Sequence, residues 1–200
     1  KVAVQIDGAS VGSEELYRIG TQLFTDPSIY KQAEVIRGTV GSFEYGSGIV
    51  GGVVRLETID ASDMTGGKPG IAFQQTFGGA TNEDGFSSSS TIAFMPSERG
   101  EFLANYTWRE QGLQEDGNGN IIGNSDFELP SFLIKGGLYF GDDNEHRLRA
   151  SFSQTETTER DKPYDSFGTT AGFFGNVDRD TLSKVATLGY DYDPVDNDLI

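Results

Sequence analysis

The sequence contains no cysteine among its 200 residues and has a single histidine, His146. Without cysteine the chain has no disulfide framework, thiolate zinc site, iron–sulfur cluster or cysteine nucleophile. One histidine also argues against a histidine-rich metal site and against a Ser-His-Asp triad. We therefore expect no metal site, no cofactor and no catalytic residue in this chain, and predict that the protein is not an enzyme.

Basic residues are also scarce, because 15 Lys and Arg stand against 31 Asp and Glu, giving a formal net charge of −16. Nucleic-acid binding needs a basic surface, so we exclude nucleic acid as a partner. No hydrophobic run approaches the roughly 18 residues of a membrane-spanning helix. A transmembrane β-barrel remains open, because its strands carry their signal in alternation.

Neither end of the sequence resembles the end of a complete protein. The chain begins at Lys1 with a strand-like Val2–Ile6 and shows no signal peptide. Its last residues, 197–200, resemble a turn followed by the start of another strand. We therefore expect an internal fragment of a longer protein.

Residues 1–66 mix short strands with helical pieces. Asp26 and Pro27 have the residue types of a helix N-cap and first helical position, which predicts a short helix running to Gln32. Strands are predicted at Val2–Ile6, Ala33–Arg37 and Gly52–Thr58. The segment has little apolar material, so we predict a small α+β unit that depends on surrounding protein.

From about Ile71 the pattern changes to the period of two that is typical of β-strands. Six strands are predicted, at Ile71–Phe77, Ser88–Met95, Phe102–Trp108, Phe132–Phe140, Leu148–Phe152 and Leu182–Tyr192. Long polar connections alternate with short ones. The long ones are Gly78–Ser87, Gln111–Glu128 and Glu159–Thr181, and the short ones are Pro96–Gly100, Gly141–Glu145 and Pro194–Asp198. Transmembrane barrels alternate long outer loops and short inner turns in this way.

The two faces of these strands also differ. Aromatic residues fall near the strand ends on one face, where a membrane barrel carries its girdles: Trp108, Phe140, Tyr190 and Tyr192. The same rings would also suit the core of a β-sandwich. The other face is too polar for a dry core and suits a wet lumen, because it carries Asn105, Thr107, Arg109, Lys135, Arg147 and Arg149.

Six strands cannot close a barrel, because single-chain barrels begin at eight strands. An eight-stranded barrel has no room for a folded unit inside, whereas barrels of about 22 strands hold one. The predicted fold is therefore an α+β plug domain followed by antiparallel transmembrane β-barrel strands. Residues 1–66 would be the C-terminal part of the plug, and residues 67–200 the first six or so strands of a large, plugged barrel.

Three motifs in residues 33–58 resemble the plug signature of TonB-dependent outer-membrane receptors. They are Ala33–Gly38 (AEVIRG), Tyr45–Gly48 (YGSG) and Gly51–Thr58 (GGVVRLET), with motif positions Gly38, Tyr45, Gly46, Gly51 and Gly52. Val4–Gly8 is similar to an upstream plug strand of that family. Phe24–Pro27 and Thr58–Asp63 resemble the haem and haemoglobin receptors. Haem receptors often use a plug histidine, which residues 1–66 lack, so either Tyr17 replaces it or the ligand is not haem.

The resemblance implies roles for several side chains. Plug arginines of this family pair with glutamates of the wall, which suggests that Arg37 and Arg55 make plug–barrel contacts with strands outside this fragment; simple exposure is the alternative. Tyr17 and Arg18 lie in the region that corresponds to the plug apex. With Phe173 and Phe174 of a long loop they are the candidate ligand-binding residues, and a solvated loop is the alternative.

The implied function is uptake of haem or an iron chelate across the outer membrane of a Gram-negative cell by energy-coupled rearrangement of the plug. The implied partners are outer-membrane lipid, the ligand itself, and TonB, which would bind an N-terminal box absent from these residues. A secreted β-sandwich binding module or adhesin is the first alternative. An outer-membrane lipase or protease is the second, and His146 would have to be its base.

Overall fold

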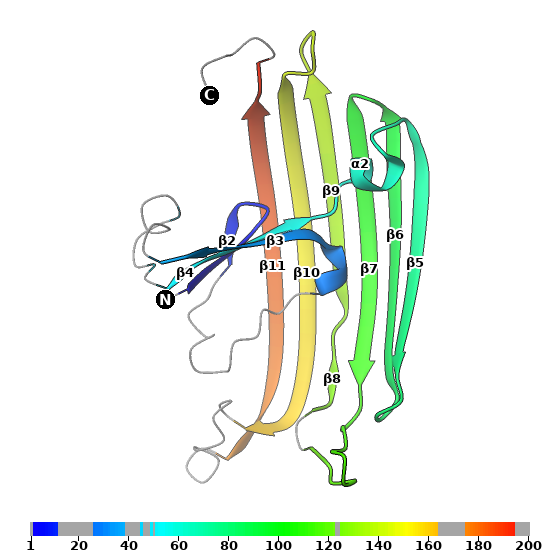
Figure 1. The fold of residues 1–200 in the computed structure, drawn as a ribbon, viewed down its shortest axis with the longest axis vertical. Helices are drawn as coiled ribbons and strands as arrows, with labels where there is room; N and C mark the ends of the chain where they lie inside the picture. Colours follow the sequence, from blue (N-terminus) through cyan, green and yellow to red (C-terminus); the bar gives the residue numbers. More distant parts are fainter. Residues whose placement is uncertain are drawn as a thin grey trace.

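The computed structural model describes residues 2–11, 26–38, 45, 49, 51–122, 125–163 and 175–194. These residues form a small sheet, a large sheet and two short helical elements (Figure 1). Helices in this described part of the chain are all too short or too polar to cross a membrane.

The small sheet contains four strands in the order β2-β1-β4-β3. They are β1 (Val2–Ile6), β2 (Ala9–Val11), β3 (Tyr30–Arg37) and β4 (Gly52–Thr58). Strands β1 and β4 are parallel, and the other pairs are antiparallel. Asp7 and Gly8 join β1 to β2 with positive φ angles of 47° and 83°, as a tight two-residue hairpin requires. The strands predicted at 2–6 and 52–58 are confirmed, and residues 33–37 belong to the longer β3.

Two short helical elements accompany the small sheet. The 3₁₀-helix η2 (Pro27–Ile29) begins as predicted, with the Asp26 carboxylate accepting a 2.8 Å hydrogen bond from the Ser28 amide. The prediction that it continues to Gln32 is wrong, because β3 begins at Tyr30 and pairs with β4. Helix α2 (Ala61–Thr65) was not predicted, since five residues are too few to display a helical period.

The large sheet is antiparallel and contains all six predicted strands in one layer (Figure 1). They are β5 (Gly70–Ala80), β6 (Gly85–Ser97), β7 (Gly100–Gln111), β9 (Ser131–Phe140), β10 (His146–Pro163) and β11 (Asn176–Tyr192). A two-residue strand, β8 (Phe127–Glu128), lies between the ends of β7 and β10. The described strands therefore do not form the two stacked layers of a sandwich.

Three sequence predictions about the limits of these strands are wrong in the same way. The connection predicted at Glu159–Thr181 is shorter, because β10 continues to Pro163 and β11 begins at Asn176. The long connection predicted at Gly78–Ser87 shortens to residues 81–84, because β5 and β6 stay paired as far as Ala80 and Gly85. His146 lies before the predicted strand Leu148–Phe152 but is the first residue of β10, opposite Phe140 and Tyr192. Backbone hydrogen bonds extend each strand beyond its apolar alternation, and alternation alone does not detect such extensions.

The large sheet has one apolar face open to its surroundings and one face that meets the small sheet. The open face exposes large hydrophobic side chains from every long strand, including Phe73, Phe94, Phe102, Leu138, Leu148 and Leu188. On the opposite face Ala93, Met95, Leu103 and Leu133 form a buried cluster with Ile29 and Ala61. A second cluster joins Val4, Ile6 and Leu56 of the small sheet to Val185 of β11.

Candidate functional site

The candidate site is the charged contact between the two sheets, with Lys135 at its centre. Pleating places Lys135 of β9 on the face opposite to Ile134, so its side chain is 6% exposed while Ile134 remains open. Its Nζ lies 2.8 Å from Asp60 Oδ1 and 3.0 Å from Thr58 Oγ1. The Thr58 carbonyl accepts a further hydrogen bond at 3.2 Å. The ammonium group therefore uses all three of its donors on residues 58–60.

Asp60 lies directly before helix α2 and is contacted by cationic side chains from three different strands. Besides Lys135, Lys31 of β3 approaches at 2.6 Å and Arg147 of β10 at 3.5 Å. Burial disfavours the charged carboxylate, but the hydrogen bonds and charges of Lys135 and Lys31 outweigh burial and lower the pKa of Asp60 to about 2. Asp60 is therefore ionised throughout the physiological pH range, and the contact is an ion pair there.

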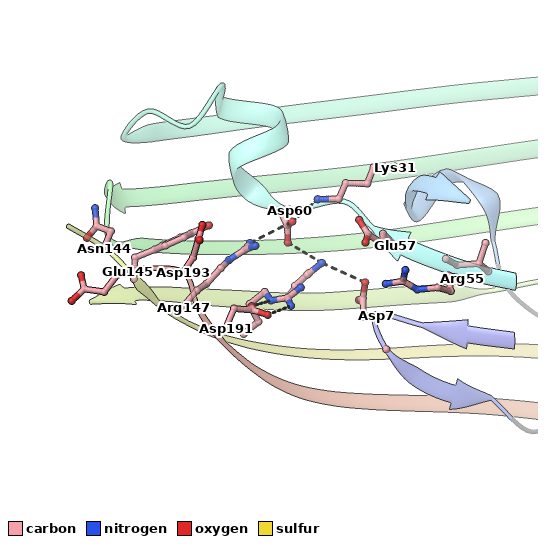
Figure 2. Close-up of a pocket in the computed structure, with 15 residues that line it drawn as sticks. Asp7, Lys31, Arg55, Glu57, Asp60, Asn144, Glu145, Arg147, Asp191 and Asp193 are labelled. Carbon is pink, nitrogen blue, oxygen red and sulfur yellow. Dashed lines mark hydrogen bonds and ion pairs between the residues drawn. The ribbon is translucent and has the colours of Figure 1, made fainter. Parts of the chain in front are cut away.

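Asp7 joins the β1–β2 turn to the same cluster. Its left-handed backbone turns the carboxylate toward the end of β4, where it accepts hydrogen bonds from the Thr58 amide at 2.9 Å and the Thr58 hydroxyl at 2.6 Å. Lys135 Nζ lies 3.6 Å from Asp7 (Figure 2). The Ser151 hydroxyl of β10 also donates to the Asp7 carboxylate, at 3.4 Å. This turn thus ties two strands of the small sheet to two strands of the large sheet.

A third carboxylate of the cluster, Glu101, comes from the large sheet itself. Its Oε1 lies 2.8 Å from an Arg147 nitrogen and accepts a 3.3 Å hydrogen bond from the Tyr139 hydroxyl. Its Oε2 accepts a hydrogen bond from the Ser62 amide in the first turn of α2, at 3.1 Å. The Arg147 guanidinium lies 5.1 Å from the centre of the Tyr139 ring, a cation–π distance. Glu101 therefore holds α2 against the large sheet.

A second polar contact lies around η2. The Asp26 carboxylate is fully buried and lies 3.4 Å from Arg109 Nε of β7. The neighbouring Ser28 hydroxyl lies 3.1 Å from the Thr107 hydroxyl and 3.3 Å from that of Ser89. In both polar contacts, carboxylates of residues 1–66 (the first segment) pair with cationic side chains of the large sheet.

A polar cavity of about 470 Å³ opens beside the charged cluster (Figure 2). It is lined from both sheets, and among its residues are Asp7, Asp60, Lys135, Arg147, Arg149 and Asp191. The last two form a bidentate ion pair at 2.8 and 3.0 Å. Within the described ranges no group of three or more His, Asp or Glu side chains is arranged to hold a metal ion. The cavity can hold water and polar groups, and the six charged side chains named above are already in ion pairs with one another.

The structure places the residues predicted as plug–barrel contacts as follows. Arg55 pairs with Glu34 on the neighbouring strand of its own sheet at 2.9 Å and lies over the Tyr45 ring. Arg37 is exposed at the end of β3. Contacts of these arginines with glutamates of other strands stay a prediction. The contacts that the structure displays have the opposite polarity, with acidic groups on the first segment and basic groups on the large sheet.

The motif glycines have local structural reasons. Gly52 has a φ of 126°, and a Cβ there would meet the carbonyl oxygen of Ile36. Gly38 also has a positive φ, and Gly51 lies in an exposed bend. Gly46 and all four candidate ligand-binding residues lie outside the described residues: Tyr17, Arg18, Phe173 and Phe174. Their binding role stays a prediction.

Sequence reasoning did not identify Asp7, Asp60 and Glu101 as site residues. Asp7 and Asp60 fall inside the short motifs Val4–Gly8 and Thr58–Asp63, and Glu101 directly precedes the predicted strand Phe102–Trp108. The available signal was the basic half of the site, because Arg109, Lys135 and Arg147 on one strand face require buried acidic partners.

Comparison with known proteins places the whole chain beside bacterial iron and haem receptors. No protein-family model matches it. It is 25% identical over 197 residues to a hemin receptor of Yersinia pestis and 24% identical to one of Yersinia enterocolitica. Each match covers 98% of this chain and 28% of the relative, so the chain spans less than a third of these proteins.

Solved structures share the fold. The FrpB iron transporter of Neisseria meningitidis superposes with a TM-score of 0.76 at 22% identity, over 98% of this chain and 29% of that one. The Serratia marcescens hemophore receptor HasR, solved with its hemophore HasA and heme, superposes with a TM-score of 0.73 at 22% identity, over 98% of this chain and 28% of that one. The resemblance read from residues 33–58 is thereby confirmed: over nearly all of its length, this chain is similar to TonB-dependent outer-membrane receptors.

Proposed function

We propose that this chain is part of a TonB-dependent outer-membrane transporter, in which residues 1–66 belong to the plug and residues 67–200 form the first strands of a barrel of about 22 strands. The observation that carries the proposal is the two-faced large sheet. Its open face exposes apolar side chains such as Phe73, Phe102 and Leu188, which suit lipid. Its other face holds a separately folded sheet by buried ion pairs.

The polar character of the contact supports a plug that rearranges. A permanent internal interface is usually apolar, whereas a contact that opens and closes resembles the more polar transient interfaces. Lys135 and Asp60 pair beside a cavity that water can enter, and Arg109 of the large sheet pairs separately with Asp26. Energy for the rearrangement would come from TonB, acting on a segment upstream of β1.

The proposed cargo is haem or an iron chelate. Support comes from the hemin receptors at 24–25% identity and from the iron transporter and hemophore receptor that share the fold. Tyr17 and Arg18 with Phe173 and Phe174 are the proposed ligand contacts. Tyr17 is the candidate axial ligand, should the cargo be haem. We place the protein in the outer membrane and assign it no enzymatic activity.

Growth on defined iron sources tests the proposal. The full-length protein is produced in a Gram-negative host without its own haem and siderophore receptors, in iron-depleted medium supplied with haemin or with ferric chelates. We expect growth on at least one of these sources, and no growth in a matched host without TonB. Failure on every source, or growth that does not need TonB, would overturn the proposal. A secreted binding module would instead be recovered soluble without detergent.

A further inference from the structure

We infer that the moving part of the plug ends at Thr58, and that helix α2 stays with the barrel wall when the plug rearranges. This inference rests on the proposed transport function and makes it more specific. Four strands and η2 would move, while Asp60 and α2 would remain in place. The boundary lies between Thr58 and Asp60, eight residues before the change of pattern predicted after residue 66.

Helix α2 is attached to the wall by a continuous set of contacts. Ala61 is 1% exposed and packs in one cluster with Met95, Leu103 and Leu133 of three wall strands. The Ser62 amide donates to Glu101 of β7, and the Thr65 hydroxyl donates to the Met95 sulfur at 2.8 Å. The helix therefore has apolar packing and hydrogen bonds directed to the wall along its length.

The small sheet is attached differently. Its links to the wall and to α2 are mostly ion pairs and hydroxyl contacts, formed by Asp7, Asp26, Ser28, Lys31 and Thr58. Two apolar contacts accompany them. Ile29 packs in the same cluster as Ala61, and Val4, Ile6 and Leu56 form a second cluster with Val185 of β11. Separation of the sheet mainly breaks polar contacts, which water can replace.

The cavity beside these contacts supplies that water. Its volume of about 470 Å³ has room for many water molecules. Water in this cavity would hydrate the charged groups of Asp7 and Lys31 and the hydroxyl and carbonyl of Thr58 when the sheet separates. Water cannot compensate in this way for the loss of the apolar contact between Ala61 and Met95, because exposing apolar surface to water is unfavourable. Separation on the small-sheet side of Asp60 is therefore easier than separation of α2 from the wall.

Lys135 is the positioning residue of this boundary. Three of its contacts reach the sheet side, at the hydroxyl and carbonyl of Thr58 and at Asp7. The fourth, at 2.8 Å, reaches Asp60 at the start of α2. When the sheet leaves, Lys135 keeps Asp60 as its counter-ion, and Arg147 stays 3.5 Å from the same carboxylate. The ion pairs of Asp60 with Lys135 and Arg147 therefore persist whether the small sheet is in place or has separated.

Reversible cross-links test the boundary, and because these 200 residues contain no cysteine, the introduced thiols are the only ones that react in this part of the protein. One full-length variant carries Ser28→Cys and Thr107→Cys, whose side chains lie 3.1 Å apart across the sheet–wall contact. The matched variant carries Thr65→Cys and Met95→Cys across the helix–wall contact. Each is joined with a short bis-methanethiosulfonate reagent, and TonB-dependent uptake is measured before joining, after joining and after reduction.

We expect the Ser28–Thr107 link to lower uptake roughly tenfold or more, with recovery on reduction, and the Thr65–Met95 link to leave it within about twofold. Loss of uptake with both links, or with neither, would overturn the inference. A Ser28→Cys, Ser89→Cys variant repeats the first arm on β6, where the hydroxyls lie 3.3 Å apart. Absent uptake in the unmodified protein would count against the proposed function instead.

Discussion

Replacing Lys135 by methionine should loosen the small sheet selectively. The substitution keeps an unbranched chain of similar length but removes a cation that contacts Asp60, Thr58 and Asp7. Removing one partner of a buried ion pair typically costs about 3–5 kcal/mol. Lys31 and Arg147 still face Asp60, and the cavity lets water reach Asp7, so we expect the lower limit, about 3 kcal/mol.

Hydrogen exchange of the full-length protein in detergent measures this loss locally. A tenfold change in an equilibrium corresponds to about 1.4 kcal/mol, so amides of β4 should exchange roughly 150-fold faster in Lys135→Met than in the unmodified protein. The matched control is Lys184→Met on β11, where the lysine is exposed. Equal exchange of β4 in the two variants would refute the reasoning that Lys135 fastens the sheet.

Three further changes test other parts of the structure. The folded pKa of Asp60 is about 2 against an ordinary 3.8, so Asp60 contributes roughly 2 kcal/mol above pH 4 and loses it as the pH falls toward 2. The Asp60→Asn variant should lack this contribution at pH 7, and the protection of its β4 amides from hydrogen exchange should no longer fall between pH 4 and 2. A fall in protection equal to that of the unmodified protein would contradict this reasoning. Gly52→Ala forces a Cβ toward the Ile36 carbonyl at a positive φ and should cost about 1–3 kcal/mol in thermal unfolding, whereas Gly117→Ala, with open space around its Cβ, should be neutral. Leu188 is 77% exposed on the apolar face, so Leu188→Arg should destabilise the folded protein by about 2–4 kcal/mol. The amount of folded, heat-modifiable protein in outer membranes should fall accordingly, with Leu188→Ala as control. Equal membrane levels of these two variants would show that Leu188 does not face lipid.

The sequence predicted the strands well and their limits less well. Alternation depends on which face a side chain occupies, so runs such as Phe102–Trp108 display it clearly and give β7 its place. On either side of the turn at residues 81–84, and at His146, the residues do not alternate between apolar and polar. Gly78–Ala80 still pairs with Gly85–Ser87, and His146 with Phe140, through backbone hydrogen bonds that leave no trace in hydropathy.

Only the basic half of the candidate site could be predicted from the sequence. Arg109, Lys135 and Arg147 fall on one strand face by simple counting, and that face was expected to be wet. Their partners were hidden because Asp7 and Asp26 each have a local explanation, one as a turn residue and one as a helix cap. Those local roles account for the residue type fully, so nothing in the sequence indicates that the same carboxylates also meet a strand far along the chain.

The Thr58–Lys135 contact joins positions 77 residues apart. With Asp7 and Asp60 it forms one electrostatic unit, so its members are not free to vary separately during evolution. A lineage that exchanges the lysine for a neutral residue would need to shed a carboxylate as well. Related receptors should therefore show correlated substitution at these four positions, whereas the exposed apolar positions of the same strands drift independently among similar side chains.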